Sequence, residues 1–349
     1  MDAFGAEGIY MNIVFDSNIY IDDLKLSSID LNLVMDYLEK TKSFIYMPTV
    51  ILEEISAVYK RKLNTLLSKI DGNIRNYNSI TTTPIVYSKP DYSKEGENLI
   101  IELKRKLNIS DNHIISYKDE YFKESLSRAI NQIKPSSEGR EEVRDSIIWL
   151  TLLDLAKESS EKVIAFISNN TTDFAGNDKK SLHPRLQDDL KSNAVQIKFF
   201  TSIDEFVKEQ IPKVEKYSKE YIQSKLDLVK IGADVERYFE NNQGGIERIT
   251  DRKGYGLLNY IQITNIDLKI ESYNVYEMID DNSFFLQVEL YDEIEIETEV
   301  ECLYNSSYYL GEYETGTKIK YFYIEIMAQY NIIIKDDKII KEELEYVEL

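Results

Sequence analysis

Residues 12–18 read NIVFDSN, a short apolar run that ends in a cluster of polar side chains. A run of this length is typical of a strand buried in a parallel sheet. Parallel α/β sheets place their functional groups at the carboxyl ends of the strands. The stretch therefore predicts a buried strand that carries the carboxylate of Asp16 to the functional edge of a sheet.

Segments with strand and helix patterns alternate through the first 210 residues. The most apolar helix is expected at residues 141–158. Further strands are expected at residues 43–47, 162–168 and 193–200. This alternation is typical of an α/β fold, in which helices cover a parallel sheet. We therefore predict an α/β domain over residues 11–210, with a helical insert at about residues 64–140.

The pattern changes in the last third of the chain. Residues 211–245 are expected to form a helical connector, and apolar and polar residues alternate from residue 246 onward. In the stretch EIEIETEVEC, residues 293–302, every odd position is glutamate. One apolar face and one acidic face are typical of a half-buried antiparallel strand. We predict a smaller, acidic, β-rich domain over residues 246–349.

The net charge of −20 is unevenly distributed. Residues 1–210 hold 27 Lys and Arg and 33 Asp and Glu, a net of −6, whereas residues 211–349 hold 15 and 29, a net of −14. This balance argues against tight nonspecific binding to phosphates, although a carboxylate site neutralised by metal remains compatible with it. The acidic C-terminal surface could mimic nucleic acid, bind a basic protein partner or shield a site. It could also be a solvated face that resists edge pairing.

Other features narrow the class of protein. The chain has one cysteine, Cys302, no secretory signal pattern, and no apolar stretch near the roughly 18 residues that span a bilayer. We therefore expect a cytoplasmic protein without membrane association. Two histidines do not make a zinc site, and the sequence has no glycine-rich phosphate loop or GxSxG motif.

Four carboxylates stand where such a sheet would place a site. Asp16 ends the first strand, Glu54 lies in the helix after the second strand, Asp145 begins the apolar helix, and Asp173 follows a later strand. Each by itself also fits a turn, a helix cap or a surface ion pair. Together they would repel one another unless Mg²⁺ or Mn²⁺ neutralised them. Two such ions can activate water and stabilise the leaving oxygen of a phosphodiester.

The sequence resembles PIN domains in four motifs that occur in the same order. These are FDSN at residues 15–18, PTVILEEI at 48–55, RDSIIW at 144–149 and SNNTTDF at 168–174. The resemblance covers about residues 11–205 and is greatest to large bacterial PIN-like proteins of the DUF4935 type. It implies a PIN-like (Rossmann-like) sheet and a Mg²⁺- or Mn²⁺-dependent phosphodiesterase, usually an endoribonuclease.

The resemblance also assigns roles to individual residues. Glu54 is preferred to its neighbour Glu53 because it directly precedes Ile55, as in the family pattern. The matching metal ligands and catalytic residues are Asp16, Glu54, Asp145 and Asp173. The matching supporting residues are Asn18, Ser168 and Asn170. Among the basic residues, the candidates for nucleic-acid contacts are Arg140, Arg144, Lys179 and Lys180, although Arg144 could instead pair with a site carboxylate.

The leading hypothesis is hydrolysis of RNA by metal-activated water, with one carboxylate able to act as a general base. DNA cleavage by the same chemistry is an alternative, because nothing in the sequence shows recognition of the 2′-hydroxyl. A binding or regulatory protein, acting through the acidic C-terminal domain on a protein partner, is the alternative of a different class.

Overall fold

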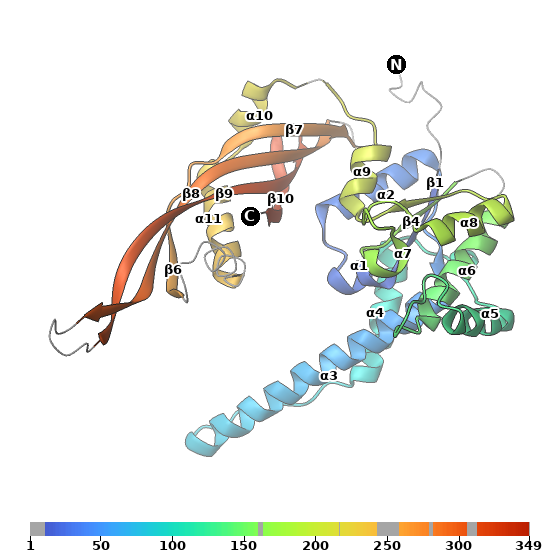
Figure 1. Cartoon of the computed structure of the whole chain (residues 1–349), viewed down its shortest axis with the longest axis horizontal. Coiled ribbons are helices and arrows are strands. Elements are labelled where there is room, and N and C mark those ends of the chain that lie inside the picture. Colours follow the sequence, from blue (N-terminus) through green and yellow to red (C-terminus); the bar gives the residue numbers. More distant parts are fainter. Residues whose placement is uncertain are drawn as a thin grey trace. The chain divides into compact units, whose positions relative to one another are not determined.

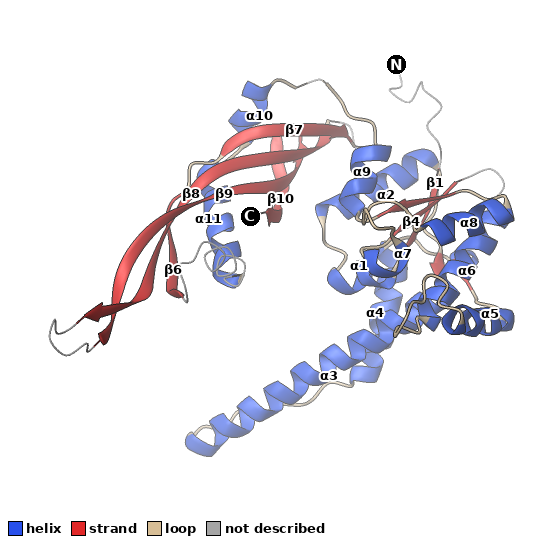
Figure 2. Ribbon diagram, viewed as in Figure 1, coloured by secondary structure: helices blue, strands red, loops and turns tan. Residues whose placement is uncertain are grey.

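The computed structural model describes residues 11–159, 163–215, 217–242, 258–278, 282–305 and 313–348. The chain divides into two compact units, Met1–Ile211 and Pro212–Leu349, which we call unit 1 and unit 2 (Figures 1 and 2). In the described part of the chain, no helix combines the length and the hydrophobicity that crossing a bilayer requires.

Unit 1 is built on a three-stranded parallel sheet. Its strands, in the spatial order β1-β4-β5, are β1 (Met11–Phe15), β4 (Val163–Ile167) and β5 (Ile197–Phe200). Phe15 is paired with Ile167, and Ile167 with Phe200, so all three strands end at the same edge. This confirms the predicted parallel α/β sheet. Asp16 and Ser168 directly follow the paired residues Phe15 and Ile167, so they lie next to each other at this edge.

The strand expected at residues 43–47 is shorter than predicted. The backbone amide of Ile13 donates to the carbonyl of Phe44, and the amide of Tyr46 donates to the carbonyl of Ile13. The chain then enters β2 (Met47–Pro48), which pairs in parallel with β3 (Ile114–Ile115). The pairing is short because helix α3 begins at the next residue. The insert therefore contributes a strand as well as helices.

Helix α6 (Val143–Glu158) packs in the core of unit 1. Its side chains Ile148, Trp149 and Leu152 are fully buried, and Asp145 lies in its first turn. Asp145 is thus attached to the core rather than to a loop. The other helices of unit 1 are α1 (Ser17–Asp22), α2 (Ile29–Thr41), α3 (Thr49–Ile80), α4 (Tyr92–Lys106), the short 3-10 helix η1 (Asp111–His113), α5 (Asp119–Ile130), α7 (Thr171–Phe174), α8 (Pro184–Asn193) and α9 (Ile203–Gln210).

Helices α3 and α4 form a hairpin in which α4 packs along the inner part of α3, and the outer part of α3 extends beyond the rest of unit 1 (Figure 1). The segment between them runs back along α3, as the ion pair of 3.5 Å between Lys89 and Asp71 shows. Gly96 of α4 lies against the side chain of Lys60, where the hairpin joins the body of the unit. We call residues 60–106 the arm.

Unit 2 is an antiparallel sheet with helices on one face. Its strands are β6 (Leu258–Asn265), β7 (Lys269–Glu277), β8 (Ser283–Asn305), β9 (Tyr313–Lys335) and β10 (Lys338–Glu348). The spatial order is β10-β9-β8-β6, and β7 also pairs with β8. The segment expected as a helical connector contains α10 (Lys219–Lys225) and α11 (Leu228–Asn241), both within unit 2.

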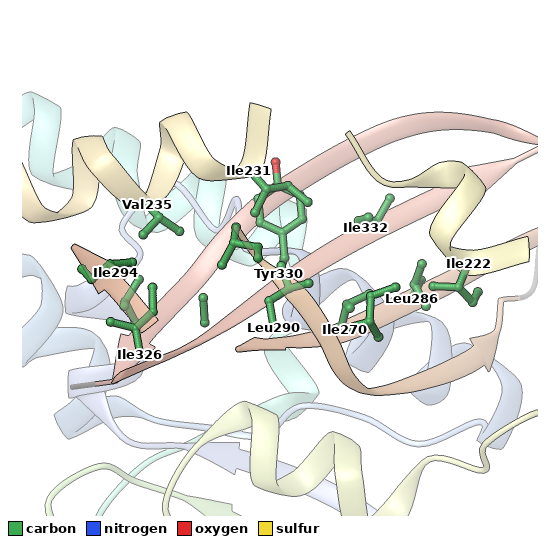
Figure 3. Close-up of a cluster of buried hydrophobic side chains, with 14 of the residues drawn as sticks. Ile222, Ile231, Val235, Ile270, Leu286, Leu290, Ile294, Ile326, Tyr330 and Ile332 are labelled. Atoms are coloured by element: carbon green, nitrogen blue, oxygen red, sulfur yellow. The ribbon is translucent and has the colours of Figure 1, made fainter. Parts of the chain in front are cut away.

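The core of unit 2 lies between the sheet and these helices. Ile222 of α10 and Ile231 of α11 are fully buried against strand side chains such as Leu286 and Ile332 (Figure 3). The predicted alternation is confirmed over the first part of residues 293–302, because Ile294 and Ile296 are buried whereas Glu293 is exposed. The side chains of residues 300–302 lie outside the described set.

Candidate metal centre

The site begins at the carboxyl end of β1. Asp16 is 3% exposed and forms the N-cap of α1, where one carboxylate oxygen accepts the backbone amide of Ser17 at 2.7 Å. The other oxygen accepts the hydroxyl of Ser168 at 2.6 Å and the amide of Asn18 at 3.0 Å. The predicted supporting residues Ser168 and Asn18 therefore hold the Asp16 carboxylate in one orientation.

The end of β4 links Asp16 to Asp145. The Ser168 hydroxyl accepts the backbone amide of Asn170 at 3.1 Å, and the Asn170 side-chain amide donates to Asp145 at 2.9 Å. Asp145 is 2% exposed, in the first turn of α6. A chain of hydrogen bonds thus connects carboxylates that are 129 positions apart in the sequence.

Glu54 joins this network through Arg144. The Arg144 guanidinium donates to Asp145 at 3.1 Å through Nε and to Glu54 Oε1 through Nη1. Its neighbour Glu53 is exposed and accepts a hydrogen bond from the hydroxyl of Tyr117 at 3.4 Å. Only Glu54 of the adjacent pair therefore faces the other carboxylates. Arg144 was a candidate for nucleic-acid contact or for pairing with a site carboxylate, and in the structure it pairs with Glu54 and Asp145.

A fifth carboxylate, Glu142, was not expected at the site. Oxygen atoms of Glu142, Asp145 and Asp173 all lie within 4.8 Å of one another. Glu142 is the N-cap of α6, three positions before Asp145, and the side chains of the N-cap and of the third helical residue lie close together at the start of a helix. That spacing was the signal that could have identified Glu142 from the sequence.

The remaining basic candidates differ in their surroundings. Arg140 lies 3.6 Å from Asp173 and 3.9 Å from Glu142, at the edge of the carboxylate group. The backbone amides of Lys179 and Lys180 donate to Gly176 and Asp178 within one exposed turn. The structure thus brings Arg140 and Arg144 to the carboxylates and leaves the two lysines on the surface that follows α7.

Burial dominates the electrostatics of the network. Desolvation, together with the charge of Asp16, raises the pKa of Asp145 to about 7, although Arg144 lowers it. Desolvation also raises the pKa of Asp16, against the hydrogen bonds from Ser168 and the backbone of Ser17. Both shifts show that negative charge is costly here in the absence of a cation.

The residues fit a hard divalent cation. The five carboxylates of the network and the guanidiniums of Arg140 and Arg144 together carry a formal charge of −3, which one or two divalent cations would offset. Glu54 Oε2, Asp173 Oδ1 and Asn18 Oδ1 are buried and accept no hydrogen bond from the described residues, so each has a lone pair for coordination, with Arg140 3.6 Å from Asp173 Oδ1. Oxygen donors are those that Mg²⁺ and Mn²⁺ prefer. The five carboxylates are Asp16, Glu54, Glu142, Asp145 and Asp173.

Comparison with known families agrees with this geometry. Residues 13–174 match the family model of the PIN domain. No curated protein and no solved structure matches the chain. A PIN domain therefore covers residues 13–174, with the acidic cluster at the edge of its parallel sheet. The PIN domain family is a nuclease family, and its nucleases act on nucleic acid.

Proposed function

We propose that unit 1 is a Mg²⁺- or Mn²⁺-dependent endoribonuclease. The observation that carries the proposal is the group of Glu142, Asp145 and Asp173 within 4.8 Å, inside a PIN domain. Asp16 and Glu54 join this group through Ser168, Asn170 and Arg144. Such a set can hold divalent cations, and these would stabilise the negative charge that develops on the attacking and leaving oxygens when a phosphodiester is hydrolysed.

Each part of the network has a proposed role. Asp16, Glu54, Asp145 and Asp173 are the ligands, with Glu142 added by the structure. A divalent cation held there would activate water and stabilise charge on the leaving oxygen. Asn18, Ser168 and Asn170 orient the carboxylates, which limits the reorganisation needed when a cation binds. Arg144 would have to move away from one carboxylate to complete the site.

RNA is the proposed substrate, and resemblance to the PIN-like proteins of the DUF4935 type supports this choice. DNA remains the alternative substrate for the same chemistry. Arg140 lies at the rim of the carboxylate group, and Lys179 and Lys180 are exposed after α7, so all three are proposed phosphate contacts. The single cysteine fits a reducing cytoplasm as the proposed compartment.

The test is cleavage of a mixed-sequence RNA by the full chain in Mg²⁺ or Mn²⁺, with EDTA as the metal-free reference. We expect Asp16→Asn and Asp145→Asn each to reduce the rate by more than about 100-fold, since even residues that only support a metal ligand typically contribute ~10–100-fold. Asp188→Asn is the matched control, because Asp188 is an exposed aspartate on α8 whose partner is Lys191. Equal rates in all four proteins would refute the proposal, and cleavage of DNA alone would change the substrate.

The second candidate function is regulation through the acidic sheet of unit 2. The tyrosine hydroxyls of Tyr321 and Tyr323 donate at 2.7 Å to Glu297 and Glu295, so these carboxylates form an ordered row with exposed rings beside them. An ordered acidic row fits a basic protein partner or competition with nucleic acid. This candidate and the nuclease are compatible, since they use different units.

A further inference from the structure

The arm has the opposite charge to the rest of the molecule. Residues 60–106 hold ten Lys and Arg and five Asp and Glu, a net of +5 in a chain whose net charge is −20. On α3, the only acidic residue beyond Glu54 is Asp71, and it is paired with Lys89. The exposed side chains of Arg61, Lys69 and Arg75 make no ion pair among the described residues.

The basic face of the arm starts at the carboxylate site. Arg61 follows Glu54 by seven residues, or about two helical turns, so both lie on nearly the same line along α3. At about 100° per residue, Lys69 and Arg75 lie roughly 60° to either side of that line. With a rise of ~1.5 Å per residue, these cations extend to about 30 Å from Glu54. A negatively charged chain along this face would therefore end at the site.

The arm also carries exposed aromatic rings. Tyr77 is 44% exposed, Tyr87 is 36% exposed and Tyr92 is 44% exposed. Tyr77 lies near the end of α3 and Tyr87 in the connecting segment, whereas Tyr92 begins α4, about one turn before Gly96 and therefore near the base of the arm. The arm therefore offers exposed rings as well as cations, and unpaired bases stack on aromatic side chains while their phosphates contact Lys and Arg. In a duplex the bases are already stacked and would not use these rings.

We propose that the arm binds single-stranded nucleic acid and leads it to the carboxylate site. The cations of α3 contact phosphates that are about three nucleotides apart, and the exposed tyrosines stack on bases. The part of the inference that leads the strand to the carboxylate site rests on the proposed nuclease function. Binding by the arm does not depend on cleavage. A strand that reaches from the site to Arg75 needs about nine stacked nucleotides, at ~3.4 Å each.

Binding is tested without cleavage, on the full chain in EDTA, by fluorescence anisotropy with a single-stranded RNA of 20 nucleotides. The variant Arg61→Gln, Lys69→Gln, Arg75→Gln should raise Kd by about tenfold or more. It should also make the slope of log K against log salt shallower by about 2, since each phosphate contact contributes ~0.7. The variant Lys123→Gln, Lys191→Gln, Lys338→Gln removes the same charge from exposed sites outside the arm and should bind nearly as the wild type does. Equal Kd values for both triple variants would overturn the proposal.

The aromatic contribution has its own matched pair. Tyr77→Ala, Tyr87→Ala, Tyr92→Ala should weaken binding by at least about fivefold, whereas the corresponding three Tyr→Phe changes should retain the affinity, because stacking needs the ring and not the hydroxyl. A duplex RNA of the same length should compete poorly. Equal competition by the duplex would overturn the single-strand assignment, and a protein partner would be indicated if the alanine variant bound RNA as the wild type does.

Cleavage assays distinguish a wrong arm proposal from a wrong nuclease proposal. In Mn²⁺, the arm variant should lower kcat/KM for the 20-nucleotide substrate much more than for a five-nucleotide substrate, since a short strand of about 17 Å does not reach Lys69 or Arg75. If the wild type cleaves neither substrate but the arm variant still loses binding, the nuclease proposal fails and the arm proposal stands. If the arm variant loses no more kcat/KM on the 20-nucleotide substrate than on the five-nucleotide substrate, the arm proposal fails.

Discussion

Adjacent glutamates on α3 have different surroundings although they share the same helical turn. Glu54 is half-buried and ion-paired with Arg144, whereas Glu53 is exposed beside Tyr117. The difference arises because successive helix positions point about 100° apart, so only one of two neighbours faces the carboxylate network. This pair therefore offers a comparison in which size, charge and helix position are nearly constant.

We expect Glu54→Gln to weaken Mn²⁺ binding by about tenfold or more, because the amide removes one anionic donor from the set. Glu53→Gln should bind Mn²⁺ as the wild type does. Isothermal titration calorimetry measures both constants, and RNA cleavage should follow the same order. A larger loss for Glu53→Gln than for Glu54→Gln would place the ligand at the other glutamate.

The raised pKa of Asp145 predicts that the metal-free protein becomes less stable as the pH rises. Its pKa of about 7 in the folded state lies above its ordinary value of 3.8, so the folded protein binds this proton more tightly than the unfolded chain does. The stabilisation from that proton is complete below about pH 4 and is lost as the pH rises through about 7. In EDTA, Tm should therefore fall between about pH 5 and pH 8, and Asp145→Asn should reduce the fall.

Divalent cations should reverse this trend, because the deprotonated carboxylate is the form that coordinates metal. Mn²⁺ should raise Tm more at about pH 8 than at about pH 5.5, as differential scanning fluorimetry can measure. An equal Mn²⁺ effect at both pH values would contradict a site built around Asp145.

At the scale of elements, α3 connects two functions. Its first turns lie in unit 1 beside the sheet and carry Glu54, whereas its last turns are exposed and carry Arg75 and Tyr77. Exposed helical turns gain little from tertiary packing, so local propensity decides how firmly they form. Gly72 lies in this part of α3, where a glycine lowers the stability of the helix.

Gly72→Ala should stabilise the arm by up to about 1 kcal/mol. Among the described residues, no heavy atom lies within 4 Å of the position that its Cβ would occupy, so the substitution meets no steric obstacle there. Amide hydrogen exchange across α3 is the measurement, and slower exchange beyond residue 65 is the expected result. Gly139→Ala is the opposing control, because Gly139 has φ of +71° and alanine is strained there. Faster exchange in Gly72→Ala would show that the arm is not limited by helix propensity.

At the scale of the whole molecule, each unit has its own hydrophobic core. The core of unit 2 consists of residues between Ile222 and Val347, and the units meet in the chain between Ile211 and Pro212. A unit with its own core and a single chain connection can fold alone. The acidic sheet is thus separable from the carboxylate site by one truncation.

A chain that ends at Ile211 should unfold in one cooperative transition and retain stabilisation by Mn²⁺, because every carboxylate of the site lies in unit 1. Circular dichroism and fluorimetry measure both properties. If unit 2 shields the nuclease, truncation should raise RNA cleavage. Unchanged cleavage would leave unit 2 without a regulatory role, and a truncated chain without a cooperative transition would refute independent folding of unit 1.

Much of unit 1 could be predicted from the sequence because the relevant signals are local. A buried strand such as β1 is a continuous apolar run, and the apolar pattern of α6 spans many turns. Polar residues at strand ends follow from the topology of a parallel sheet, which is why Asp16 was a candidate from the pattern alone, whereas Ser168 was assigned through the resemblance to PIN domains. The second strand was predicted less well, since its length depends on where α3 begins and on pairing with the distant β3.

The sequence by itself determined the two-part organisation, the parallel sheet and the acidic motifs, because hydrophobic periodicity and short motifs are properties of neighbouring residues. Only the tertiary structure decided that Glu142 joins Asp145 and Asp173, that Arg144 bridges Glu54 and Asp145, and that the basic arm continues the face of Glu54. These facts depend on how distant segments pack and on how far each helix continues. Desolvation and Coulomb interactions between such segments arise only once the chain has folded.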